Sequence, residues 1–272
     1  MNYDMHCHST NSDGRQSVDE MCRSAIERGV TGFAVTDHAD MNFYESRDTY
    51  NRIRKSLADI AQARDTYGDQ LKLLRGVELG EYLYSPADAD KILALNDYDV
   101  ILGSVHLVPK ARFDRPYNRI PFSEDGTDDE IREYLKLYFE LLSETVDAFD
   151  FDVLAHLTCP IRYITGVHQR PADAFEFEDK IREILRKIID RNIALEYNTG
   201  GLNAKCNFCN VQNEQLFSLY KELGGNLITI GSDAHVATGI GKTFQTATAH
   251  LKELGFDHVC YYENRKPQMI TI

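Results

Sequence analysis

The sequence lacks the features that would place a chain in a membrane or on an export pathway. It contains no run of about 18 apolar residues, the length that a membrane-spanning helix needs. The first predicted strand starts at Tyr3, which leaves no room for a signal peptide before it. We therefore expect a cytoplasmic protein without a membrane partner.

Positive charge is also in short supply. The chain has 30 lysine and arginine residues against 43 aspartate and glutamate residues, which gives a net charge of −13. Because proteins that bind nucleic acids neutralise phosphates with basic side chains, this balance argues against a nucleic-acid partner. The six cysteines are scattered and only Cys206 and Cys209 lie close together, so we expect thiols rather than a disulfide framework.

A glycine motif of the form Gly-x-Gly-x-x-Gly is missing after the first predicted strand, which excludes the simplest nucleotide-binding fold. What the sequence does contain is an alternation of short apolar strands and amphipathic helices. Predicted strands cover residues 3–5, 32–35, 71–77, 98–102, 152–156, 193–195 and 227–230. Predicted helices cover residues 17–29, 46–67, 86–95, 128–149, 174–191, 214–223 and 243–254, and a last short strand covers 259–262. This α/β pattern predicts parallel strands with helical crossovers in one domain, residues 1–272, as a closed barrel or an open sheet.

Every one of the seven strands ends in a side chain that can bind metal or substrate. In chain order these groups are His6/His8, Asp37/His38, Glu78, His106, His156, Glu196/Asn198 and Asp233/His235. Residues i and i+2 of an extended chain point the same way, so Asp233 and His235 can address one point. All the carboxyl ends of parallel strands converge on one face only in a barrel, which favours the barrel over the open sheet.

The chemistry of these strand ends indicates a metal centre. Six of the nine histidines in the chain lie there, where a lone histidine would be an ordinary core or surface residue. Imidazole and carboxylate ligands without thiolate suit zinc, manganese or iron. One zinc ion needs four ligands, so this larger set predicts two or three divalent transition metal ions.

Basic residues near these strand ends are candidates for phosphate binding. Arg162 follows the fifth strand closely enough to reach the metal face, and its alternative is a surface ion pair. Lys242 lies in a Gly-Ile-Gly-Lys-Thr turn that either contacts phosphate or only starts a helix. The long loop of residues 107–127 is either functional or a plain surface insertion, and its basic side chains are Lys110, Arg112, Arg115 and Arg119.

Taken together, these residues resemble the motifs of the polymerase and histidinol phosphatase (PHP) superfamily. The matching segments are His6-Cys7-His8 with Ser12-Asp13-Gly14, Thr36-Asp37-His38, Gly76-Val77-Glu78, Gly103-Ser104-Val105-His106, His156, and Gly231-Ser232-Asp233-Ala234-His235. The resemblance extends over essentially the whole chain and implies a distorted (β/α)7 TIM-like barrel with a trinuclear metal centre. The segment 195–202, with His156 and Arg162-Tyr163, is similar to the histidinol-phosphatase branch.

The resemblance also implies a ligand set for three metal ions. One ion would take His6, His8, Glu78 and Asp233, and a second would share Glu78 and add His106 and His156. The third would take Asp13, His38 and His235. Asp37 is expected to support a neighbouring ligand, and Glu81 is either a supporting group or a surface acid.

The activity that the resemblance implies is hydrolysis of L-histidinol phosphate, in histidine biosynthesis, by a hydroxide that bridges the metals. Glu78, Asp233 and His235 are the expected catalytic residues, with Asp233 or His235 moving protons. Arg162 and Lys242 would bind phosphate, and Glu196 and Asn198 would read the cationic end of the substrate. The alternatives are a phosphodiesterase or exonuclease, a phosphatase for another phosphomonoester such as phosphotyrosine, and a non-catalytic metal-binding barrel. Oligomeric state is left open.

Overall fold

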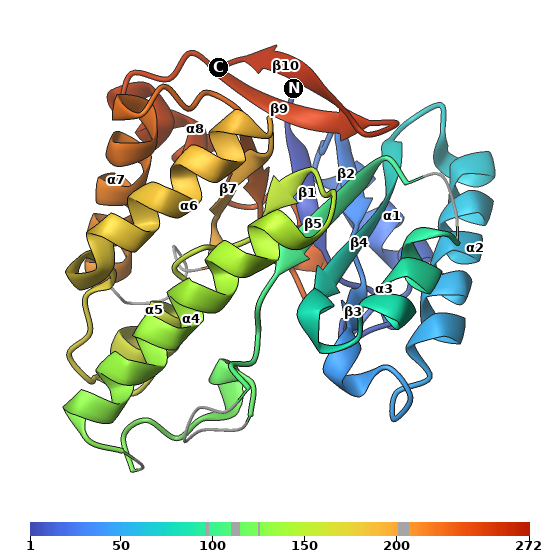
Figure 1. Cartoon of the computed structure of the whole chain (residues 1–272). Coiled ribbons are helices and arrows are strands. Elements are labelled where there is room, and N and C mark those ends of the chain that lie inside the picture. Colours follow the sequence, from blue (N-terminus) through green and yellow to red (C-terminus); the bar gives the residue numbers. More distant parts are fainter. Residues whose placement is uncertain (96–97, 110–114, 125, 201–206) are drawn as a thin grey trace.

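Seven parallel strands form the centre of the molecule in the computed structural model, which describes residues 1–95, 98–109, 115–124, 126–200 and 207–272. The strands lie side by side in chain order (Figure 1): β1 (Tyr3–Cys7), β2 (Gly32–Val35), β4 (Lys72–Gly80), β5 (Val100–Ser104), β6 (Val153–Leu154), β7 (Ala194–Asn198) and β8 (Ile228–Gly231). A short strand, β3 (His38–Asp40), pairs with the end of β4. The seven strands carry buried residues on both faces, as expected for a parallel sheet covered by helices.

The sheet curls until β8 meets β1, but the two strands touch over a short stretch only. Cys7 and Ala234 form an isolated parallel bridge, His8 N donates to Ala234 O at 3.0 Å, and Asp233 N donates to His6 O at 2.9 Å. The result is a nearly closed seven-stranded barrel with an irregular seam. The predicted distorted barrel is therefore confirmed.

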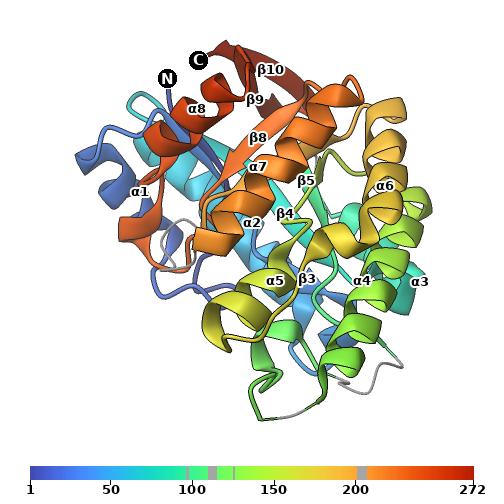
Figure 2. The ribbon, with the colours of Figure 1, turned by 90° about the vertical axis from the view of Figure 1, so that its left-hand side faces the viewer.

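Helices surround the barrel, as the two perpendicular views show (Figures 1 and 2). They are α1 (Val18–Glu27), α2 (Thr49–Tyr67), α3 (Pro86–Leu93), α4 (Asp128–Ala148), α5 (Cys159–Ile161), α6 (Glu178–Asp190), α7 (Asn207–Glu222) and α8 (Phe244–Glu253). The predicted start of α1 is confirmed, because Ser17 and Glu20 form a capping box in which each side chain accepts from the other's backbone N–H. The helices within the described ranges include none that is long and apolar enough to cross a membrane.

Several boundaries differ from the sequence prediction. The predicted strand 71–77 runs on to Gly80, so Glu78 lies within β4 and not after it. Helix α7 starts at Asn207, seven residues before the predicted start at 214, and β3 was not predicted at all. Lys110, Arg112 and Cys206 lie outside the described residues, as does the side chain of Cys209. The structure therefore does not test the prediction for the two neighbouring cysteines, nor that for two of the four basic side chains in the loop 107–127.

A C-terminal hairpin, β9 (His258–Glu263) and β10 (Lys266–Thr271), covers the end of the barrel at which the strands begin (Figure 1). The ring of Tyr261 stacks on Tyr3 with centroids 4.0 Å apart, and Lys72 Nζ pairs with Glu263 Oε2 at 2.7 Å. Only β9 was predicted, because Lys266 and Pro267 make the start of β10 a poor strand by local preference. Antiparallel pairing with β9 decides its conformation.

Asp99 ties this hairpin to the barrel, and its removal should destabilise the fold. The buried carboxylate accepts from Arg75 N at 2.8 Å and Asn264 N at 3.1 Å, and it pairs with Arg64. Asp99→Asn keeps the shape but loses the charge, so we expect a loss of about 1.5–3 kcal/mol in the free energy of unfolding, measured by urea denaturation. Asp150→Asn, on a side chain that is 92% exposed, is the control and should change it by less than about 0.5 kcal/mol. Equal midpoints for the two variants would show that Asp99 is not an anchor.

Candidate metal centre

Glu78 is the centre of the candidate site. Its side chain is fully buried at the end of β4, and the rings of five histidines surround its two oxygens. Oε2 lies 2.8 Å from His38 Nδ1, 3.3 Å from His6 Nε2 and 3.7 Å from His8 Nε2. Oε1 lies 2.8 Å from His156 Nε2 and 3.1 Å from His106 Nε2. One carboxylate therefore faces ligand atoms from β1, β3 and the loops after β1, β5 and β6.

Asp233 approaches the same group from the other side of the barrel seam. Its Oδ1 lies 3.3 Å from His8 Nε2 and 3.9 Å from His6 Nε2. The backbone of Asp233 has a φ of 55°, so the chain is not extended here as the sequence argument assumed. Asp233 and His235 nevertheless converge, with His235 Nδ1 3.7 Å from Asp233 Oδ1, because a left-handed residue replaces the expected strand geometry.

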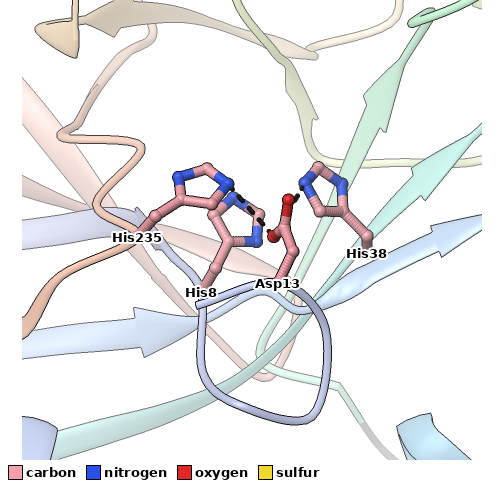
Figure 3. Close-up of side chains that lie close together, drawn as sticks. All are labelled: His8, Asp13, His38 and His235. Carbon is pink, nitrogen blue, oxygen red and sulfur yellow. Dashed lines mark ion pairs between the residues drawn. The ribbon is translucent and has the colours of Figure 1, made fainter. Parts of the chain in front are cut away.

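Asp13 forms the outer edge of the site, on the loop after β1 (Figure 3). Its Oδ1 lies 3.1 Å from His235 Nε2 and 3.6 Å from His38 Nε2, and the ring of His8 stacks on that of His38 with centroids 4.2 Å apart. The loop folds tightly at Gly14, where an added Cβ would lie 2.1 Å from His8 O. Only glycine leaves room for this approach, which brings Asp13 back over the histidines.

Asp37 faces this loop and not the cluster of histidines. Its carboxylate accepts from Ser9 N, Ser9 Oγ and Ser12 Oγ, each at 2.7 Å, and from Ser56 Oγ at 2.5 Å. Asp37 is fully buried, so these bonds satisfy a charge that would otherwise be costly. Its position agrees with the expected supporting role, since it holds the segment that carries Asp13.

Unsatisfied buried atoms indicate that the site fits metal ions. His6 Nε2, His8 Nε2, His38 Nδ1 and Glu78 Oε2 are buried, and none makes a hydrogen bond to a residue that the structure describes. Buried polar atoms are rarely left so, and here several of them lie within 4 Å of Glu78. Imidazole nitrogens and carboxylate oxygens in this arrangement are a donor set for divalent transition metals.

The mutual charges of the cluster shift its protonation strongly. Burial alone would raise the pKa of Glu78, but His38 and His106 hold it well below its usual value. Burial lowers the pKa of His38, yet the Glu78 and Asp40 carboxylates raise it to about 9. His8 has a pKa lowered to about 4 by burial and by neighbouring His38. Glu78 thus stays ionised at neutral pH and attracts positive charge to the centre of the site.

The grouping of the ligand atoms overlaps with the predicted one without matching it in full. Among the described residues, five sets of three or four side chains have ligand atoms within 4.8 Å of one another: His8/Asp13/His38/His235, His6/Glu78/His156, His6/His8/Asp233, His38/Glu78/His106 and Asp40/Glu81/His106. All nine predicted ligands belong to at least one set. His8 groups with the outer residues as well as the inner ones, so the division of ligands among ions remains a prediction.

Arg162 lies beside the cluster, as predicted, and its side chain is only 16% exposed. Nη1 pairs with Asp233 Oδ2 at 3.2 Å, and Nη2 donates to Asn198 Oδ1. The surface ion pair considered as the alternative is therefore excluded by burial. Asn198 lies at the end of β7 and also donates to Glu196 Oε2 at 3.2 Å.

Two other side chains that were predicted to contact the substrate, Lys242 and Glu196, lie in different surroundings. Lys242 is exposed, and none of the described contacts joins its side chain to a predicted ligand, which favours the helix-start alternative for its turn. Glu196 is buried, with Oε1 2.7 Å from His6 Nδ1 and Oε2 accepting from His156 N at 2.7 Å. Both oxygens of Glu196 are therefore engaged by predicted metal ligands.

Two acids next to His106 complete the site. Asp40 Oδ1 lies 3.2 Å from His106 Nδ1, and the buried Glu81 accepts from His106 N and Leu107 N, so the surface alternative for Glu81 is wrong. Sequence reasoning missed Asp40 because it missed β3. The available signal was the spacing of His38 and Asp40, which alternation along a strand places on one face.

Comparison with known proteins identifies the family to which the chain belongs. The profile of the PHP domain matches residues 4–200, which is most of the chain and includes the predicted ligands up to His156. The chain belongs to the PHP domain family. The expected superfamily is thereby confirmed.

Individual relatives of this PHP protein cover nearly its whole length. A protein of Clostridium acetobutylicum named "Probable histidinol-phosphatase" is 28% identical over 97% of this chain and 98% of its own. The crystal structure of histidinol phosphate phosphatase from Lactococcus lactis, in complex with zinc, L-histidinol and phosphate, matches with a TM-score of 0.78 at 25% identity, covering 98% of each chain. The DNA polymerase/3'-5' exonuclease PolX of Bacillus subtilis is 25% identical over 85% of this chain but only 34% of its own.

Replacing Glu78 tests whether it is the shared ligand of this PHP site. We expect the purified wild-type protein to hold more than one transition metal ion per chain by elemental analysis. Glu78→Gln keeps the shape but removes the charge and one ligand oxygen, so it should hold fewer ions and lose at least about a hundredfold in phosphatase turnover. Circular dichroism should show an intact fold. Near-normal metal content and turnover in Glu78→Gln, or a fully active wild type with a single ion, would contradict the shared-ligand role.

Proposed function

We propose that this protein is a histidinol-phosphatase, which hydrolyses L-histidinol phosphate to L-histidinol and phosphate with two or three divalent metal ions. The observation that carries the proposal is the cluster of imidazoles around Glu78, with a partly buried arginine at its edge. The likeness to the Lactococcus lactis enzyme over 98% of both chains supports the choice of substrate, since that structure holds zinc, L-histidinol and phosphate. The whole chain, residues 1–272, would act as one phosphatase domain in the cytoplasm, where amino-acid biosynthesis takes place.

The nine side chains of the predicted ligand set would hold the metal ions. Those ions, zinc by analogy with the Lactococcus lactis structure and manganese or iron as alternatives, would act as Lewis acids and lower the pKa of a bound water towards neutrality. Glu78 would be shared between ions because its two oxygens face different histidines. Three carboxylates, Asp13, Glu78 and Asp233, bring negative charge that the ions would balance.

Arg162 would bind the phosphate group. A buried guanidinium offers planar, charge-assisted hydrogen bonds that fit phosphate oxygens, and these bonds are strong where water is excluded. Asp233 now occupies Nη1, and Asn198 occupies Nη2. These two partners would orient the guanidinium before substrate arrives, so less conformational freedom is lost on binding. Asp233 and His235, at the open side of the cluster, would move protons.

The charges around the cluster suit a substrate with an anionic and a cationic end. One cavity beside the histidines is lined by His156, Arg162 and Asn198. A second, on the other side, is lined by three acids, Asp13, Asp40 and Glu81, by the aromatic rings of Phe43 and Tyr117, and by Arg47 and Arg119. Phosphate next to Arg162 would leave the amine and imidazole of histidinol to the acid-lined cavity. This assignment replaces the predicted contact of Glu196 with the cationic end.

Comparison of substrates is the direct test of the proposed function. Protein loaded with zinc or manganese should hydrolyse L-histidinol phosphate with a kcat/KM at least about tenfold above that for a phosphotyrosine peptide or a nucleotide diester. p-Nitrophenyl phosphate serves as a generic monoester. A preference for the diester would instead identify a phosphodiesterase, and preference for the peptide a protein phosphatase. Absence of turnover on every ester after metal loading would leave a non-catalytic barrel.

Replacing Arg162 separates phosphate binding from metal binding. Arg162→Ala removes a charge-assisted contact of about 1.5–3 kcal/mol, which corresponds to a loss of roughly ten- to hundredfold in kcat/KM for L-histidinol phosphate. Its metal content should stay unchanged, because guanidinium is not a metal ligand. Arg162→Lys should recover part of the loss, since an ammonium restores the charge without the fork. Arg132→Ala, on a side chain that is 64% exposed, is the matched control. Wild-type kinetics in Arg162→Ala would refute the assignment.

A further inference from the structure

Glu196 lies outside the predicted ligand set, yet its carboxylate contacts two of the predicted ligands. It lies on β7, with its side chain 1% exposed. Oε1 lies 2.7 Å from His6 Nδ1, and Oε2 accepts from His156 N at 2.7 Å. His6 belongs to β1 and His156 follows β6, so one carboxylate joins two ligands from distant parts of the chain.

The contact with His6 decides which ring nitrogen can bind a metal ion. A neutral imidazole has one protonated nitrogen and one with a free lone pair. A carboxylate at Nδ1 favours the proton there, which leaves the lone pair on Nε2. His6 Nε2 faces Glu78 and Asp233, at 3.3 and 3.9 Å, and makes no hydrogen bond to a described residue. Glu196 therefore selects the tautomer that presents Nε2 to the centre.

The contact with His156 acts on the backbone instead. His156 has a φ of 28°, a conformation that is unfavourable for a residue with a side chain. Its N–H is donated to Glu196 Oε2, and this bond helps to hold the strained turn. In that conformation the ring reaches inward, with Nε2 2.8 Å from Glu78 Oε1. Glu196 thus fixes the direction of a second ligand through its main chain.

Gly231 on the neighbouring strand supports this placement independently. A Cβ added at Gly231 would lie 2.0 Å from Glu196 Oε1 and 2.7 Å from His6 Cβ. Any larger residue would therefore push the carboxylate away from the imidazole. Room for Glu196 is provided by β8, the strand that leads to Asp233 and His235.

We propose that Glu196 is a positioning residue that couples the His6 and His156 sides of the metal centre, so that its loss weakens metal binding on both sides. The proposal rests on the metal-dependent function proposed above. It differs from the sequence prediction, in which Glu196 touches the substrate. The two roles predict different results when Glu196 is replaced. Loss of a positioning residue lowers the affinity for metal ions, whereas loss of a substrate contact raises KM.

Glu196→Gln distinguishes them. The carboxylate accepts from the ring Nδ1–H of His6 with one oxygen and from the backbone N–H of His156 with the other. The amide keeps an acceptor oxygen at only one of these positions, and its NH₂ group then faces the other donor. Titration of the metal-free protein with zinc against a chromophoric chelator should show affinity reduced about 10–100-fold for more than one ion. Gly231→Ala, whose added Cβ presses on both Glu196 Oε1 and His6 Cβ, should act in the same direction. Glu263→Gln, on β9 at the opposite end of the barrel, is the matched control and should bind zinc as the wild type does.

Three results would overturn the proposal. The first is wild-type zinc affinity in Glu196→Gln together with a raised KM for L-histidinol phosphate, which would restore the substrate contact. The second is weakening confined to a single ion, which would remove the coupling. The third is protonation of His6 at Nε2, measured by nitrogen-15 NMR of histidine in the zinc-loaded wild type. The proposal expects protonation at Nδ1, so this test needs no variant. Because zinc is the probe in the titration and in the NMR measurement, the second and third results are independent of the substrate assignment. A wild type that binds no zinc would instead end the proposed function.

Discussion

The buried carboxylate of Glu78 is the constraint on which the rest of the structure depends. A charge without solvent access costs several kcal/mol unless opposite charge surrounds it, and here five histidines from four parts of the chain do so. His6 and His8 come from the end of β1, His38 lies on β3, and His106 and His156 follow β5 and β6. The barrel meets this demand because all its strand ends open on one face, and the loops of that face then add Asp13 and Arg162.

The seam between β1 and β8 brings the two ends of the chain to the same point. Few backbone bonds cross it, and the buried Asp4 carboxylate compensates by accepting from Ser232 N at 2.9 Å and Gly241 N at 2.8 Å. His6 and His8 lie on one side of the seam, and Asp233 and His235 lie on the other. The site is therefore complete only when the barrel is closed. The β9–β10 hairpin covers the opposite end of the barrel and contributes no side chain to the predicted ligand set.

The side chains around the candidate metal ligands form a continuous polar network. Asp233 contacts Arg162, Arg162 contacts Asn198, and Asn198 contacts Glu196, which holds two histidines. The group proposed to bind phosphate and the groups proposed to orient the metal ligands are thus neighbours in one chain of hydrogen bonds. Such a network is rigid when all its members are satisfied, which is what a preorganised site requires.

Much of the fold and of the candidate site follows from sequence alone. Alternating strands and helices predict the barrel, and histidines at matched strand ends predict a shared site, because both depend on local periodicity. Local pattern alone does not separate Glu78 from Glu196, since each is a glutamate near the end of an apolar strand, and the family resemblance gave Glu196 a substrate contact. The tertiary structure does so: Glu78 points to the centre of the five rings, while Glu196 lies behind His6 and contacts its other nitrogen. β3 and β10 were not predicted either, because pairing with β4 and β9 decides their conformation. Local pattern determines which residues lie at strand ends and can reach the site. The register and closure of the barrel decide which ring nitrogen of a histidine ligand each carboxylate contacts.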